Sequence, residues 1–441
     1  MRQINIILVI LLCGCLIGCS RSASPPTAGT PDDGPDQWIE QALTDLAQVE
    51  VTEENSADIK STYSRVLVAI ANRGDDETYK RIVADLPEER RPQTPYLWLV
   101  WAQMARGDRS AAEETVELAA PDQHSSLRGF IAVRVVDQSI SEGALLAEEF
   151  AREGDEYQAN RVWNHICGRQ LEQGDVEDAE RTLRRITDPD YREWRSSDIR
   201  AAKLAEESTD ALLARQDEEG NLPEECVEAI LIKVNRALAA GDIDGASGIA
   251  AKLPLAKDRA GVYMDVAEAI QAGGSNERLA EAILLCETEL DAGDWDAESA
   301  LIRMSLRLGV TSVHLKMGDT ASALVQMRQA EEEANTPYEG ESEVSLMMRQ
   351  FTYESFCKGT LVTLLISAGH IEEALHAVTQ DDGSMSVEYA IIFVRLYASQ
   401  GMPDEARPFI EDAKTPLERA MLRSALLEGD AERLRAESES K

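Results

Sequence analysis

The sequence predicts an all-α protein built as a solenoid, that is, a stack of helical hairpins. A glycine turn recurs along the chain, and an alanine follows five residues after it, with apolar or small residues at offsets nine and twelve. These offsets place the side chains on one face of a helix. A proline closes many of the units, and no stretch keeps the alternating pattern of a β-strand. Together these observations predict paired helices separated by regular turns.

The turns recur with a period of about 33 residues, which is typical of helical repeat proteins. The first two turn glycines are one period apart, and each of the next two steps is twice as long. Each double step predicts a turn that lacks glycine, one near Ser141 and one near residues 207–210. The predicted turn glycines are Gly74, Gly107, Gly174, Gly241, Gly274, Gly318, Gly369, Gly401 and Gly429.

Within each unit, the residue types follow from the geometry of a helical hairpin. Glycine adopts the left-handed conformation that ends a helix, and the aspartate that often follows it caps the next helix. The small alanine allows the two helices of a hairpin to approach closely. We therefore expect turn and packing roles for six glycine–alanine pairs: Gly107 and Ala112, Gly174 and Ala179, Gly241 and Ala246, Gly318 and Ala323, Gly369 and Ala374, and Gly401 and Ala406.

The second helix of a unit resembles that of the tetratricopeptide repeat. Five positions match its turn glycine, alanine, large apolar, apolar and proline positions in order: Gly174, Ala179, Leu183, Ile186 and Pro189. The resemblance covers most of the chain from the first turn glycine onward, although the first helices lack the repeat's Trp, Leu-Gly and Tyr positions. It implies a right-handed α-solenoid of about 11 hairpins that grips a partner in its concave face, mostly through first-helix side chains. The candidate binding helices are then 191–206, 258–272 and 388–400.

Residues 1–18 have the pattern of an export signal. The apolar run at 6–17 is shorter than the roughly 20 residues that span a bilayer. It leads into Leu16-Ile17-Gly18-Cys19, which resembles the lipobox of a bacterial lipoprotein, and the resemblance implies that the Cys19 thiol carries a diacylglycerol anchor. Two alternatives stay open: modification of Cys15 instead, or an ordinary secretory signal with no lipid.

The remaining chain divides by composition into a tether and a folded body. Residues 19–36 are rich in Pro, Ser, Thr, Gly and Asp, a composition that cannot bury a core, so we expect a disordered tether. Residues 37–441 form the predicted solenoid, with an irregular stretch at 274–369, where the steps between turn glycines become longer than the period. We therefore expect a bacterial envelope protein, periplasmic or surface-facing, whose only membrane contact is its N-terminal lipid.

Composition and motifs argue against several functions. The formal net charge of −37 at pH 7 disfavours nucleic acid and anionic lipid as partners. The chain after the signal holds no phosphate-binding loop, zinc-protease, nucleophile-elbow or Cys-x-x-Cys motif, so we expect no catalytic residue, metal or cofactor. Its four cysteines are spaced at roughly two repeat periods, too far to pair in a stack of hairpins. We expect them to be buried thiols: Cys167, Cys226, Cys286 and Cys357.

These expectations favour a binding scaffold. Our hypothesis is a lipid-anchored, envelope-facing solenoid that binds a partner protein or peptide, whose identity the sequence does not reveal. One alternative is an enzyme on a helical toroid that acts on envelope glycans. An aromatic content of 5% and the lack of a convergent His, Tyr or Arg cluster stand against it. The other alternative is an architectural spacer with no saturable partner.

Overall fold

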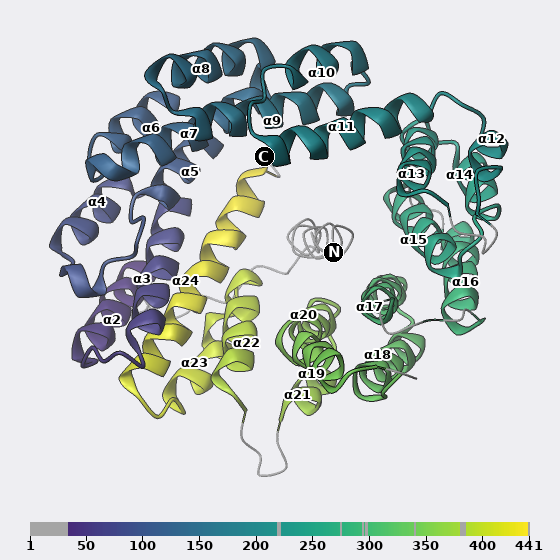
Figure 1. Ribbon diagram of the computed structural model, residues 1–441. Coiled ribbons are helices and arrows are strands. Elements are labelled where there is room, and N and C mark those ends of the chain that lie inside the picture. Colours follow the sequence, from purple (N-terminus) through teal and green to yellow (C-terminus); the bar gives the residue numbers. More distant parts are fainter. Residues whose placement is uncertain are drawn as a thin grey trace. The chain divides into compact units, whose positions relative to one another are not determined.

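The computed structural model is all-helical over the residues that it describes, which are 34–217, 222–273, 276–292, 295, 299–338, 341–379 and 385–439. In those residues the chain forms 23 α-helices and no β-strand (Figure 1). The predicted all-α class is therefore confirmed. The export signal, Cys19 and most of the tether lie outside the described residues. Pro35 and Asp36, which we assigned to the tether, instead begin helix α2, because proline is favourable at the first helical position.

The described chain divides into two compact units. The terminal unit comprises residues 34–169, 185–188 and 375–439, and the inserted unit comprises residues 170–184 and 189–374. The sequence pattern predicts one solenoid, with any irregularity within 274–369. The division instead falls near residues 170 and 374, so that the two ends of the described chain belong to the same unit.

The terminal unit pairs helices from both ends of the described chain. α5 packs against α6, α7 against α8, and α24 against α2, α3, α22 and α23. In Figure 1 the yellow α24 lies beside the purple α2 and α3. The helices are α2 (Pro35–Gln48), α3 (Ser56–Asn72), α4 (Asp76–Asp85), the 3-10 turn η1 (Glu88–Arg90), α5 (Leu97–Ala105), α6 (Arg109–Val116), α7 (Pro121–Gln138), α8 (Ile140–Glu153), most of α9 (Glu156–Glu172), α22 (Val387–Ser399), α23 (Pro403–Glu411) and α24 (Pro416–Glu439).

The inserted unit is built from the same pairing of consecutive helices. α13 packs on α14, α15 on α16 and α17 on α18, and α15 also packs against both α13 and α17. The helices are α10 (Val176–Leu183), α11 (Pro189–Leu204), α12 (Thr209–Leu213), α13 (Glu224–Ala239), α14 (Ile243–Ala250), α15 (Ala256–Gly273), α16 (Asn276–Ala292), α17 (Ala300–Met317), α18 (Thr320–Asn335), α19 (Glu343–Thr352), the π-helical turn η2 (Tyr353–Cys357), α20 (Lys358–Ser367) and α21 (Ile371–Val378), which runs past residue 374.

The turn glycines end helices in the left-handed conformation. At Gly107, where φ is 77°, the N–H of Asp108 donates to the carbonyl of Gln103 at 2.9 Å and the N–H of Gly107 donates to that of Met104 at 3.0 Å. The Asp108 carboxylate then accepts from the N–H of Ala111 at 3.0 Å and caps the next helix. The same pair of backbone bonds closes the turns at Gly74, Gly174, Gly241, Gly318, Gly369 and Gly401. Each of the six packing alanines is 0% exposed.

One predicted turn is wrong, one lies outside the described residues, and one turn was missed. Gly429 lies inside α24 rather than at a turn, because glycine also serves where two helices come into backbone contact. Gly274 lies outside the described residues. Gly154, with φ of 82°, ends α8 in the same way as the other turn glycines, but its position does not fit the period. The turns without glycine occur at Ser139 and Ser208, whose side chains cap α8 and α12.

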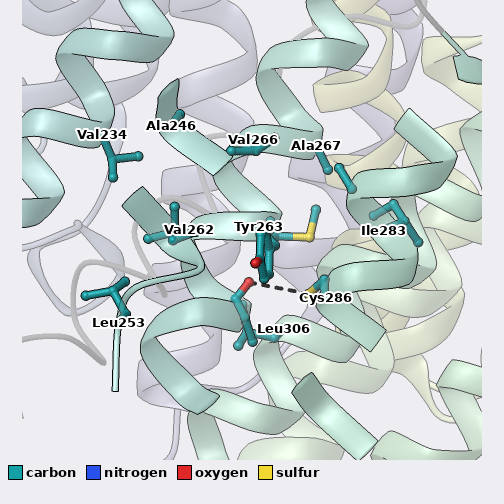
Figure 2. Packing of buried hydrophobic residues seen from close by; sticks show 14 of the residues in the cluster. Val234, Ala246, Leu253, Val262, Tyr263, Val266, Ala267, Ile283, Cys286 and Leu306 are labelled. Atoms are coloured by element: carbon teal, nitrogen blue, oxygen red, sulfur yellow. Dashed lines mark hydrogen bonds between the residues drawn. The ribbon is translucent and has the colours of Figure 1, made fainter. Parts of the chain in front are cut away.

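A continuous apolar core runs through the inserted unit from α11 to α17. Figure 2 shows side chains from successive helices meeting there, among them Val234, Val262 and Leu306. The Cys286 thiol lies in this core and donates to the carbonyl of Ala260, with 3.4 Å between sulfur and oxygen. All four cysteines of the body are buried thiols, as the sequence predicts, so they contribute to the packing as small apolar side chains.

Candidate partner-binding face

The three helices indicated by the tetratricopeptide resemblance correspond to α11, α15 and α22. Of these, α15 carries an acidic face, on which Asp258 is half-buried and Asp265 and Glu268 are exposed. Spacings of seven and three residues place the three carboxylates on one side of the helix. Lys316 of α17 borders this face, and its Nζ donates to Oε1 of Gln271 at 3.0 Å.

The protein around α15 shifts the titration of these acids. Asp265 touches solvent, but desolvation by its surroundings raises the pKa of its carboxyl to about 7, and the charge of Glu268 adds to the shift. Desolvation also raises the pKa of Glu268, which Lys316 partly offsets. Within the described ranges, no grouping of three or more His, Cys, Asp or Glu side chains could hold a metal ion. The face is therefore an acidic surface whose carboxyls ionise at higher pH than usual.

The terminal unit has an open cavity of about 510 Å³ between α2, α3, α4 and η1. Its lining is mostly aliphatic, together with Tyr63, Arg81, Asp85 and Arg90. The Arg90 guanidinium donates to the carbonyl oxygens of Leu46 and Val49, so this cation satisfies the end of α2.

Helix α19 presents an apolar face to solvent. Val344, Met347, Met348 and Phe351 are 64, 59, 56 and 59% exposed. They occupy positions i, i+3, i+4 and i+7, which form one side of an α-helix; we call these four residues the α19 stripe. Within the part of the chain that the structure describes, no other helix exposes four large apolar side chains. Contiguous exposed apolar residues of this kind mark interaction surfaces in soluble proteins.

A buried ion pair fixes the opposite face of α19. The side chain of Arg349 is 2% exposed and that of Glu341 is 1% exposed, and Arg349 Nη2 donates to Glu341 Oε2 at 2.6 Å. Nη2 also donates to the carbonyl of Thr336 at 2.9 Å, and the guanidinium lies 4.9 Å from the ring centroid of Tyr338. Because the charged residue faces inward, α19 has the reverse of the polarity usual for a surface helix.

The hydrogen bonds to Glu341 lower the pKa of its carboxyl. Burial alone would raise the pKa, but hydrogen bonds from Arg349, from the backbone N–H of Tyr338 and from the Ser345 hydroxyl lower it below its usual range. The carboxylate is therefore charged at neutral pH and orients the guanidinium. The pair holds α19 in the rotation that exposes its apolar stripe.

The π-helical turn η2 changes the helix face between α19 and α20. Five turns of an α-helix take about 18 residues, so Val344 and Val362 would share a face in an uninterrupted helix. The extra residue of a π turn rotates the next helix by about 100°. Val344 is 64% exposed, whereas Val362 is 0% exposed. Tyr353 and Cys357 in the turn belong to the same buried apolar cluster as Met304 of α17, so the turn is part of the core.

Exposed acidic residues lie at both ends of α19 and at the neighbouring end of α18. Glu343 begins α19 and Glu354 follows its last turn, and both are exposed. The end of α18 lies next to α19, because Gln350 Nε2 donates to Asn335 Oδ1 at 3.4 Å. This end of α18 carries two further exposed acids, Glu331 and Glu332. An apolar stripe within an acidic rim is therefore the most distinctive surface of the inserted unit.

The sequence pattern did not reveal this face. A sequence signal does exist: Arg349 lies opposite four apolar residues at helical spacing, which is the wrong polarity for a solvated helix. Of the predicted site residues, the six glycine–alanine pairs lie at turns and in helix contacts, and Cys19 lies outside the described residues.

Comparison with known proteins does not indicate a function, so the functional proposal rests on the geometry described above. No family model, curated protein or solved structure matches the chain. Among the described helices, none combines the length and apolar character needed to cross a bilayer.

Proposed function

We propose that this protein is a lipid-anchored, envelope-facing scaffold that binds a partner protein through the α19 stripe. The single observation that supports the proposal is the exposure of four large apolar side chains on one side of α19, each between 56 and 64% exposed. Burying apolar surface is favourable by about 25 cal/mol for each Å² removed from water, and an exposed stripe does not gain this free energy. A partner that covers the stripe recovers this free energy.

The proposal includes the architecture and the anchor expected from the sequence. The helices form a right-handed α-solenoid of about 11 tetratricopeptide-like hairpins, and Cys19 carries the lipid. The repeated turn geometry at the glycines and the burial of the paired alanines support the repeat. A rigid array of this kind presents a side chain stripe in a fixed orientation, as a binding surface requires.

Crosslinking capture of the lipidated protein from its native envelope, read by mass spectrometry, tests the proposal. Phe351→Glu and Met347→Glu place a charge in the stripe, and Leu145→Glu is the matched control, because Leu145 is a similarly exposed apolar residue (66%) on α8. We expect a stoichiometric partner that the stripe variants lose and the control retains. A Cys19→Ala form reports whether capture needs the anchor. Identical capture by all variants would refute binding through the stripe. No partner above background would refute the scaffold and favour a spacer.

A further inference from the structure

The α19 stripe also indicates the chemistry of the segment that binds it. Building on the proposed function, we propose that the partner segment is an amphipathic helix whose apolar face is bordered by basic residues. Three features of the surface support this: the shape of the stripe, the charges around it and the charges that are already neutralised.

The shape of the stripe suits a helix. From Val344 to Phe351 the stripe extends over seven residues, or about 10 Å along the axis. That length matches two turns of a partner helix, which presents its own apolar residues at i, i+3, i+4 and i+7. Met347 and Met348 form the middle of the stripe, and unbranched methionine side chains adapt to an opposing ridge at helix-packing distance.

The charges around the stripe select a basic partner. Exposed acids lie at the two ends of α19 and on the end of α18 next to it: Glu343, Glu354, Glu331 and Glu332. Glu354 and Lys358 form an ion pair with 3.3 Å between Oε2 and Nζ, so their charges offset each other, and Arg349 is buried against Glu341. Arg328 is the exposed exception, one turn before the acids of α18. The net field at the rim is negative, so lysine or arginine at the ends of a docked helix is attracted and acid is repelled.

The same charges disfavour two other occupants. Helices that lie on membranes carry Lys and Arg beside the apolar face to meet anionic lipid, whereas α19 carries one exposed glutamate, Glu343, and no exposed Lys or Arg. A second copy of this chain would bring two acidic rims together, with a formal net charge of −37 on each chain. Like-charge contact opposes that pairing.

The test uses the body of the protein, residues 19–441 with Cys19→Ala, and three labelled peptide probes. The first is a hydrocarbon-stapled helix of about 16 residues with leucines at i, i+3, i+4 and i+7 and lysines at both ends. The second replaces the lysines with glutamates, and the third keeps the lysines but scrambles the leucine spacing. Fluorescence anisotropy measures each affinity at low and high salt, with the wild-type chain and with Phe351→Glu, Met347→Glu and Leu145→Glu.

We expect the lysine-flanked helix to bind on the order of tenfold or more tightly than the glutamate-flanked helix, with the preference falling as salt rises. The scrambled peptide should not bind, and both stripe variants should lose binding while Leu145→Glu keeps it. Circular dichroism establishes that each variant is folded.

Several outcomes would overturn the inference. If the lysine-flanked and glutamate-flanked helices bind with equal affinity and the stripe variants bind neither, the preference for a basic partner is refuted but the docking face is not. If no peptide binds, the inference of a helical partner is refuted. The envelope-capture experiment then tests the proposed function independently. Undiminished binding to Phe351→Glu refutes the face itself. Stripe-dependent binding to phosphatidylcholine–phosphatidylglycerol vesicles assigns the stripe to a membrane, and a stripe-dependent dimer in sedimentation assigns it to a second copy.

Discussion

Arg65 and Glu428 lie 363 residues apart in the chain and form a two-point ion pair in the terminal unit. Arg65 Nε donates to Glu428 Oε1 at 2.8 Å, and Nη2 donates to Oε2 at 3.0 Å. A second link joins Asp45 of α2 to Arg419 and Arg423 of α24. The C-terminal helix α24 therefore completes the core of the N-terminal helices, and the terminal unit needs both parts of the chain to bury that core.

The Arg65–Glu428 pair should stabilise the docking of α24. Its side chains are 25 and 14% exposed, so solvent screening weakens the pair only in part, and we expect a coupling free energy of about 1–2 kcal/mol. The measurement is a double-mutant cycle with Arg65→Met and Glu428→Gln, read by hydrogen exchange in α3 and α24. Additive effects of the two substitutions would show that the pair contributes nothing beyond its separate side chains.

Gly429 should tolerate no side chain. A Cβ atom there would lie 2.0 Å from the carbonyl oxygen of Arg395 and 2.8 Å from Cβ of Ala398, because α24 and α22 are in backbone contact. We expect Gly429→Ala to cost about 2–3 kcal/mol of terminal-unit stability. Gly248→Ala is the control, since a Cβ there meets nothing within 4 Å and alanine favours the helix by about 0.5–1 kcal/mol. Equal melting temperatures for the two variants would contradict the packing of α24.

Arg349→Met should destabilise the inserted unit strongly. The substitution leaves the Glu341 carboxylate, 1% exposed, without its counter-ion, and we expect a loss of about 3–5 kcal/mol. The double variant with Glu341→Gln should regain part of that loss, because no buried charge remains. Urea unfolding measures both. Since the folded-state pKa of Glu341 is lowered, its stabilisation is present above the unfolded pKa of about 4.3 and is lost as pH falls through the folded value.

Asp265 should make the stability of the inserted unit fall as the pH rises from about 4 to about 7. Its folded-state pKa is raised to about 7, against about 3.9 when unfolded, so the folded chain binds the extra proton in this window and loses it above. Asp265→Asn removes the titrating group. We expect the stability gained by the variant to be larger at pH 8 than at pH 4.5, measured by hydrogen exchange in α15. A pH-independent difference would mean that the carboxyl titrates normally.

The four body cysteines should resist alkylation until the protein unfolds. All four are buried, and burial raises the pKa of the Cys286 and Cys357 thiols to about 12 in each case, so little thiolate forms at neutral pH. Intact mass after iodoacetamide treatment should show unmodified native chain and four adducts per chain in urea, with Cys19→Ala as background. Rapid labelling of the native protein would contradict the packing around these side chains.

Much of the helical framework could be predicted from residue spacing. The Gly-Asp turns, the buried alanines and the serine-capped turns are local features, because a left-handed glycine and a capping side chain act within one turn of backbone. Gly154 shows where a fixed period misleads: it is followed by the same aspartate and alanine, but it lies off the regular spacing and was missed. Gly429 shows the reverse error, since a glycine that fits the expected spacing can serve helix contact instead.

The orientation of the candidate face was decided by contacts in the folded chain. Val344 and Val362 have the same side chain on one helical stretch, yet one is exposed and the other is buried. The difference arises from the π turn between them and from the partner that Arg349 finds eight residues earlier, at Glu341. Residue spacing indicates the helical stretch but does not tell which side of it faces water.

From its sequence alone, this protein is determined to be all-helical, acidic and built of helices joined by glycine and serine turns, because those properties follow from composition and from interactions within a few residues. Only the tertiary structure decided that α24 closes onto α2 and α3 and that α19 turns its apolar face outward. The first depends on pairings between residues distant along the chain, such as Arg65 with Glu428. The second depends on the buried Arg349–Glu341 pair and on the π turn after α19. Burial is a property of such contacts rather than of any single segment.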